Sequence, residues 1–161
     1  MKRSVISGIA LALLIAFGLW WFSAAEVLKR RTQSLLSTLT LDAGTGRASR
    51  TLATYSLNKL LAPWVELDTP TIREANGNFE RVELESGFNW ISQQAKQTRF
   101  ELEKFHSVTI AGDTGNVKLT LFGLVELPHY RPADGNYAVS LDWKNGDDGW
   151  RLTQAVWTQM P

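Results

Sequence analysis

The fold is decided by residues 100–127, which read FELEKFHSVTIAGDTGNVKLTLFGLVEL. Apolar and polar residues alternate on both sides of the turn-forming run Gly112–Gly115, a pattern typical of two β-strands joined by a tight turn. We therefore predict one strand over Phe100–Ala111 and an antiparallel partner over Val117–Leu127, which together form a long hairpin.

The chain after this hairpin keeps the same two-residue period. We predict strands over Tyr137–Trp143 and Trp150–Thr158, separated by a turn at Asn145–Gly149. A loop bounded by prolines, Pro128–Gly135, connects them to the hairpin. Four consecutive strands joined by short connections predict an antiparallel meander.

The chain before the hairpin has helical periodicity instead. Val27–Leu41 and Ala48–Ala62 are predicted as helices, the second ended by Pro63, with a short strand at Val65–Asp68. A third helix is indicated by four apolar residues on one face, namely Leu84, Phe88, Ile91 and Ala95. Helices gathered on one face of an antiparallel sheet give an α+β domain, here an antiparallel sheet packed on about three helices.

The N-terminus carries a long apolar segment. Residues 4–25 are uncharged, and the stretch Ser4–Ser23 is long enough to cross a bilayer as a helix. Trp20, Trp21 and Phe22 stand at its far end, where aromatic rings prefer the membrane interface. We therefore divide the chain into a tail and transmembrane anchor, 1–25, and one α+β domain, 26–161. A cleaved signal peptide is the alternative, because small residues follow the aromatic run.

The location of the domain depends on the charges that flank this segment. Lys2 and Arg3 on one side nearly balance the cluster at residues 29–31 on the other. A short basic N-terminus before a first apolar span usually stays in the cytoplasm. We therefore expect a single-pass protein of a bacterial inner membrane with a periplasmic domain, or a soluble periplasmic protein if the segment is cleaved.

Composition excludes several classes of function. The chain of 161 residues has a formal net charge of +1, no cysteine and two histidines. Thiolate metal sites, disulfides and a thiol nucleophile are therefore impossible, and a metal site made by protein side chains is not expected. Clustered basic residues of the kind that bind nucleic acid are missing as well. We expect no cofactor, because no residue pattern in the sequence indicates one.

The order of these elements resembles the nuclear transport factor 2-like superfamily. The resemblance covers about residues 27–158 and includes the helix break Asp42–Gly44, the strand Val65–Asp68 and the ending Gly146–Leu152, a turn followed by Trp-Arg-Leu. It implies a strongly curved sheet wrapped around helices as a cone, with a pocket at the wide end.

The same resemblance suggests two weak catalytic candidates. Asp68 stands where the ketosteroid isomerases of the superfamily place their base, although Ser37 stands where they need a tyrosine. His106 would match a scytalone dehydratase histidine if it shared the inward strand face with Leu102 and Val108. Each has a structural alternative: Asp68 can organise the turn before Pro70, and His106 can be a hydrogen-bonded core residue.

Other residues are candidates for a pocket or an interface. Tyr55, Trp90, His106 and Trp150 are candidates for lining a pocket, with core packing as the alternative for the two tryptophans. His129, Tyr130 and Arg131 form a loop suited to partner contact. Strict alternation places Trp150 and Val156 on one face of the last strand and Trp157 on the other, so Trp157 is predicted to face outward as a contact residue.

We therefore expect a membrane-anchored, non-catalytic binding or assembly module that contacts a protein partner or a second copy through the sheet face. Its layout resembles the bitopic inner-membrane subunits of type IV secretion systems, and the superfamily resemblance implies a homodimer. The alternatives are a tethered isomerase- or dehydratase-like enzyme and a carrier for a small hydrophobic ligand. A base beside a second polar group in an open cavity would indicate an enzyme, whereas a cavity filled by Trp and Leu would indicate assembly.

Overall fold

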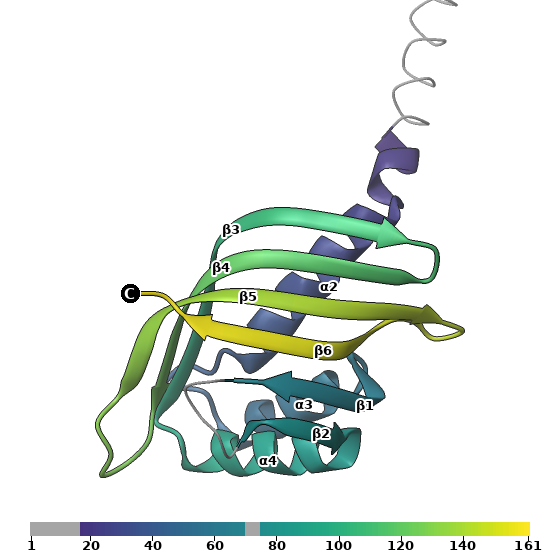
Figure 1. The fold of residues 1–161 in the computed structure, drawn as a ribbon. Helices are drawn as coiled ribbons and strands as arrows, with labels where there is room; N and C mark the ends of the chain where they lie inside the picture. The colour runs from purple at the N-terminus through teal and green to yellow at the C-terminus, as the bar shows by residue number, and fades with distance from the viewer. Residues whose placement is uncertain (1–16, 70–74) are drawn as a thin grey trace, which may run out of the picture.

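A computed structural model describes residues 17–69 and 75–161 of the protein. In chain order the elements are α2 (Ala24–Leu39), α3 (Arg47–Asn58), β1 (Leu61–Asp68), β2 (Gly77–Glu80), α4 (Arg81–Gln94), β3 (Gln97–Ala111), β4 (Thr114–Glu126), β5 (Ala133–Gly146) and β6 (Gly149–Gln159) (Figure 1). The strands form one six-stranded sheet in the order β2-β1-β6-β5-β4-β3.

The predicted antiparallel meander is confirmed, because β3, β4, β5 and β6 pair in succession, each antiparallel to the next. The expectation of a wholly antiparallel sheet is wrong. Strand β1 pairs with β6 in parallel and with β2 in antiparallel orientation, so the sheet is mixed. Sequence periodicity shows where a strand is, but the direction of its neighbour depends on the long connection that brings the two together.

The predicted second helix is too long at its C-terminal end. Helix α3 stops at Asn58, and Pro63 lies inside β1 rather than closing a helix. The pairing of β1 with β6 shifts register between Leu61 and Glu66. Such an irregularity accommodates a proline, which has no N–H to give to the ladder.

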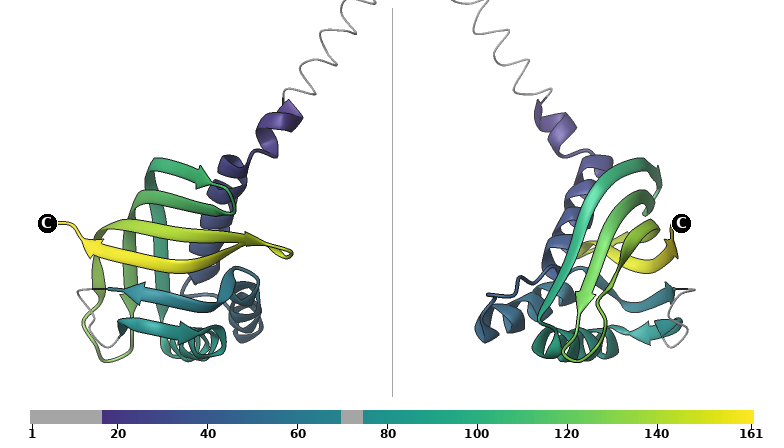
Figure 2. Two further views of the ribbon diagram at one scale, coloured as in Figure 1. Left: turned by 45° about the vertical axis from the view of Figure 1, so that its right-hand side comes forward. Right: turned by 90° about the vertical axis from the view of Figure 1, so that its left-hand side faces the viewer.

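The helices cover one face of the sheet, here called the inner face, while the opposite, outer face of β3–β6 is open. Figure 1 looks onto the outer face with α2 behind the strands, and Figure 2 shows the long strands bending around the helices. The inner face and the helices share one apolar core, whose most buried members are Leu28, Val65, Val117, Leu119, Leu121, Leu141 and Trp143.

Three β-bulges interrupt the alternation of the long strands. The register between β3 and β4 skips Glu103 and His106, and the register between β5 and β6 skips Thr153. An extra residue in one strand bends it and moves the following side chains to the opposite face. Any assignment of side chains to faces that assumes strict alternation is therefore reversed beyond each bulge.

The helix boundaries follow local hydrogen bonding. Ser23 is the N-cap of α2, and its side chain accepts a hydrogen bond from the Glu26 backbone N–H. Helix α4 starts with a capping box in which Glu80 and Glu83 each bond to the other's backbone. These contacts satisfy backbone N–H groups that lack partners inside the helix.

Most of the predicted membrane span, Ser4–Ser23, lies outside the described residues. In residues 17–69 and 75–161, no helix is long and apolar enough to cross a membrane.

Candidate functional site

The space between the inner face and the helices is filled by large side chains. Trp143 is 1% exposed and Trp150 is 6% exposed, both within the apolar core. Trp150 therefore packs as a core residue and does not line an open cavity. Within the described ranges, two buried polar atoms have no hydrogen-bond partner, the Thr32 hydroxyl and the indole N–H of Trp143.

His106 lies on the outer face of the sheet, so the prediction that it shares the inward face with Leu102 and Val108 is wrong. Its position in a bulge explains the error, because Phe105 and Val108 pack against the core on either side of it. The ring Nε2 lies 2.6 Å from the hydroxyl of Thr120, which is 8% exposed. His106 is thus an exposed histidine held by a buried threonine.

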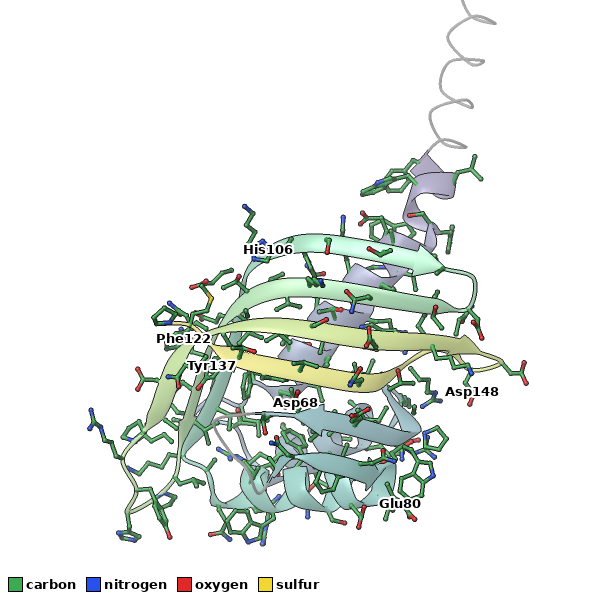
Figure 3. The ribbon with its side chains drawn as sticks, in the orientation of Figure 1. Asp68, Glu80, His106, Phe122, Tyr137 and Asp148 are labelled. Atoms are coloured by element: carbon green, nitrogen blue, oxygen red, sulfur yellow. The ribbon has the colours of Figure 1, made fainter. Side chains whose placement is uncertain are left out.

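Asp68 is also exposed on the outer face, at the end of β1. It pairs with Val156 of β6, and three further strand spacings separate β6 from the strand that carries His106. Four strand spacings of about 4.8 Å amount to roughly 19 Å. Figure 3 shows the two labelled residues well apart. The two predicted catalytic candidates therefore do not share a site.

A hollow of about 280 Å³ opens on the outer face beside His106. We call it the outer hollow. Its lining side chains are His106, Lys118, Ala138, Ser140, Val156 and Thr158. Leu119 and Val139 also border it, but their side chains belong to the core, so they contribute main chain. The outer hollow combines two basic groups, two hydroxyls and an apolar floor.

A second hollow, of about 340 Å³, lies on the same face toward the hairpin turns and includes Asn116, Asp142 and Lys144. The Asn116 side-chain amide donates to Asp142 Oδ1 at 2.6 Å and to Ser140 Oγ at 2.9 Å. These bonds connect the lining of the two hollows. Among the described residues, no group of three or more histidine, aspartate or glutamate side chains could hold a metal ion.

Two of the predicted pocket residues lie on the solvent side of the helices. Tyr55 on α3 is 64% exposed, and the Lys59 ammonium lies 5.0 Å from the centre of its ring. Trp90 on α4 is similarly exposed. Neither side chain lines an interior cavity, and their exposure offers two aromatic groups on the helical side of the domain instead.

Trp157 does not face outward, which corrects the prediction from strict alternation. The bulge at Thr153 returns it to the inner face, together with Trp150 and Leu152. Its ring packs edge-on against Phe100 at 5.8 Å and against Tyr137 at 5.9 Å between ring centres. Trp157 therefore belongs to the packing of the curved sheet.

The predicted contact loop is exposed as expected. Tyr130 is 74% exposed, and Arg131 beside it is also exposed. His129 has a φ of 67°, a left-handed conformation that non-glycine residues seldom adopt. Whether this loop contacts a partner stays a prediction.

The aromatic residues before α2 form a cluster with a basic residue. The ring of Trp21 lies 5.7 Å from that of Phe17 and 6.2 Å from that of Trp20. Arg30 places its guanidinium carbon 4.3 Å from the centre of the Trp21 ring and donates to the Trp21 carbonyl at 2.7 Å. Trp20 and Phe22 are largely exposed to solvent. Arg30 thereby ties the segment before Ser23 to α2.

Arg50 is a structural residue that the sequence analysis missed. It is 8% exposed, and its guanidinium donates to the carbonyls of Ser92 and Ala95, the latter at 2.9 Å. It also donates to the Thr45 carbonyl at 2.9 Å, which ties the turn after α2 to the C-terminal end of α4. A basic group suits the negative end of a helix. No sequence pattern marks it, because it occupies an ordinary helical position.

This arrangement of a bent mixed sheet with helices on its inner face can be compared with known structures. A nuclear transport factor 2-like superfamily protein from Salmonella enterica serovar Typhimurium superposes with a TM-score of 0.66, at 9% identity, over 85% of this chain and 91% of that one. The chain has the nuclear transport factor 2-like fold. The sequence itself matches no protein-family model and no curated protein.

Other structures with the nuclear transport factor 2-like fold agree. A protein from Cytophaga hutchinsonii superposes with a TM-score of 0.65, at 15% identity, over 86% of this chain and 100% of that one. A putative dehydratase from Streptomyces avermitilis does so with a TM-score of 0.63, at 15% identity, over 85% of this chain and 96% of that one. Identities this low establish the fold alone.

Proposed function

We propose that this protein is a membrane-anchored, non-catalytic binding or assembly module, whose domain lies on the periplasmic side of a bacterial inner membrane and contacts a protein partner there. The observation that carries this proposal is the packed interior. The place where an enzyme of this fold would hold its substrate is filled by Trp143, Trp150 and their neighbours in the described residues.

The residues before α2 support the anchor. Trp20, Trp21 and Phe22 are exposed, and Arg30 stacks on one of the rings. Exposed aromatic rings beside basic side chains are typical of the membrane–water interface, where the rings meet the headgroups and the cations meet lipid phosphates. In water the same surface would be unfavourable.

The loop at His129–Arg131 supports a partner contact. Tyrosine and arginine are enriched among the residues that dominate interface energies, and here they stand side by side in an exposed loop. The left-handed His129 adds backbone strain of a kind that clusters at functional sites.

The enzymatic alternative has less support. Although one solved structure with this fold is described as a putative dehydratase, a fold hosts many functions, and the residues must decide. Asp68 and His106 lie on different strands of the outer face, too far apart to act on one substrate. A carrier would need interior space, and the side chains of Trp143 and Trp150 lie buried in that part of the core.

The partner contact is tested by photocrosslinking in cells. A photoreactive phenylalanine analogue replaces Tyr130 in one variant and Tyr55 in a control, since the two tyrosines are 74% and 64% exposed. We expect crosslinked species identified by mass spectrometry from position 130 that are missing from position 55, and that disappear when Arg131 is also changed to alanine. Equal crosslinking from both positions would contradict the proposed contact loop.

The anchor is tested separately by washing membranes with alkaline carbonate. We expect the full-length chain to remain in the membrane pellet, because an inserted helix resists this treatment. Release of the full-length chain would contradict the anchor. A mature protein whose mass corresponds to a start near residue 26 would show that the segment is a cleaved signal peptide.

A further inference from the structure

The outer hollow has the composition of a small-ligand site. We propose that it binds a small organic carboxylate with a short apolar chain, with Lys118 and His106 at the carboxylate and Ala138 and Val156 at the chain. This inference goes beyond the assembly function and does not depend on the membrane anchor or on the contact loop.

Lys118 supplies the charge. It is exposed, and no carboxylate of the described residues forms an ion pair with its ammonium group. Its partners across the strands are Ser107 and Ser140, which are neutral. The nearest carboxylate along β5, that of Asp142, already accepts a hydrogen bond from Asn116. The ammonium is therefore available to an anion from solution.

His106 supplies an oriented imidazole ring. Bulges re-aim side chains, and this one turns the imidazole onto the outer face, where the buried Thr120 hydroxyl lies 2.6 Å from Nε2. Because Nε2 is hydrogen-bonded to the Thr120 hydroxyl, Nδ1 is the ring nitrogen that can meet a ligand. A hydrogen on Nδ1 would allow this nitrogen to donate to a carboxylate oxygen.

The rest of the hollow limits the size and kind of ligand. Its volume of about 280 Å³ lies just below the range of drug-sized pockets, so a small organic molecule fits within it. Ser140 and Thr158 offer hydroxyls at the sides, while Ala138 and Val156 give a small apolar surface between them. A charged head and a short apolar tail match this division.

Butyrate is the probe for the test, with butyramide as its uncharged analogue of the same shape. We would titrate each into the isotope-labelled full chain in neutral detergent at constant ionic strength and follow backbone amide NMR signals. We expect saturable shifts at Lys118, Ala138, Ser140 and Val156 with butyrate only. Equal affinity for butyramide, or the lack of saturable shifts, would overturn the proposal. Inorganic phosphate that binds as tightly at the same amides would also overturn it, because the site would then not select carboxylates.

Variants identify the groups responsible. Lys118→Gln should weaken butyrate binding about tenfold, the effect of losing one charge-assisted hydrogen bond. Thr120→Val should weaken it as well by releasing the imidazole. Lys144→Gln, which makes the same charge change at the second hollow of the same face, is the matched control and should bind like the unchanged protein. Equal affinities of the Lys118 and Lys144 variants would contradict the site.

Discussion

The inner and outer faces of the sheet are made by alternate residues of the same strands, yet they differ in almost every physical property. On β4, Val117, Leu119 and Leu121 are essentially inaccessible to solvent, whereas Lys118 between them is exposed. The inner face packs against the helices through these buried side chains, and the outer face carries two hollows lined by hydroxyls, amides and charges. The core therefore lies on one face of the sheet, and most of its polar and charged side chains lie on the other.

The contrast between the buried inner side and the exposed outer face predicts its largest effect on stability at Arg50. Among the described residues, Arg50 is the one charged side chain that is buried on the helical side. Arg50→Met should lower the free energy of unfolding by about 4 kcal/mol, because at least two buried carbonyls lose their donor at roughly 1–3 kcal/mol each. Urea denaturation followed by tryptophan fluorescence measures it. Arg47→Met is the control, since Arg47 is exposed and makes one bond, to Gln93. Equal losses in the two variants would contradict the assigned role of Arg50.

Adjacent residues on β4 compare the two faces directly. Leu119→Ala should cost about 3 kcal/mol, because Leu119 is 1% exposed and its removal leaves a cavity in the core. Lys118→Ala, one residue earlier, should change stability by less than about 0.5 kcal/mol. Both values come from the same denaturation measurement. A large loss at Lys118 would mean that the outer face is covered in the folded protein.

Gly115 tests how tightly the inner face is packed. A Cβ atom there would collide with the Leu28 side chain and lie 3.2 Å from both Ile110 and Trp150. Gly115→Val should therefore lower the unfolding free energy by about 2 kcal/mol through overpacking. At Gly146 a Cβ meets nothing within 4 Å, so Gly146→Val should be nearly neutral. Thermal unfolding of the two variants would show the difference, and similar melting temperatures would argue against close packing at Gly115.

Thr32 is a buried position on the inner side where a substitution is expected to raise stability. Its hydroxyl is fully buried and has no partner among the described residues, so Thr32→Val, which keeps the side-chain shape, should raise stability by about 1 kcal/mol. Chemical denaturation measures the change, and Thr98→Val serves as the control. Thr98 is equally buried but donates to the Leu39 carbonyl at 2.6 Å, so its variant should lose stability. A loss at Thr32 would show that its hydroxyl has a partner in solution.

The smallest effect is expected at the far end of the hairpin. Hydrogen bonds from Lys96, at 3.1 Å, and from Gln97, at 2.9 Å, hold the pKa of the Glu126 carboxyl below its ordinary value. The unfolded chain therefore binds this proton more readily than the folded one. The resulting stabilisation is complete above the ordinary glutamate pKa of about 4.3 and is lost as the pH falls through the lowered folded value. When the free energy of unfolding is plotted against pH, the curves of the unchanged protein and of Glu126→Gln should converge at acidic pH. Curves that stay parallel would contradict this role of Glu126.

The sequence predicted the elements of this fold better than their arrangement. Alternation located the four long strands, because one face of each is buried and the other is solvated. It failed at Trp157 and His106, because the alternation of apolar and polar residues does not mark where an extra residue enters a strand. The parallel pairing of β1 with β6 also depends on contacts distant in sequence.

The candidate site was anticipated only in part. His106 was singled out as a possible base, but the residues that surround it come from three other strands, and no spacing along the chain connects Lys118 with Val156 or Thr158. Arg50 was missed for a related reason. Its acceptors are backbone carbonyls, which every residue possesses, so the types of side chain in the sequence do not predict the interaction.

The bulges at Glu103, His106 and Thr153 also determine how this chain tolerates insertions and deletions. Each bulge holds one residue more than its partner strand, so deletion of Glu103, His106 or Thr153 alone would leave the paired residues on the faces they now occupy. A deletion elsewhere within a long strand would instead move the residues beyond it to the opposite face. Gene variants that change length within the long strands should therefore be far rarer than variants that change length in the turns between them.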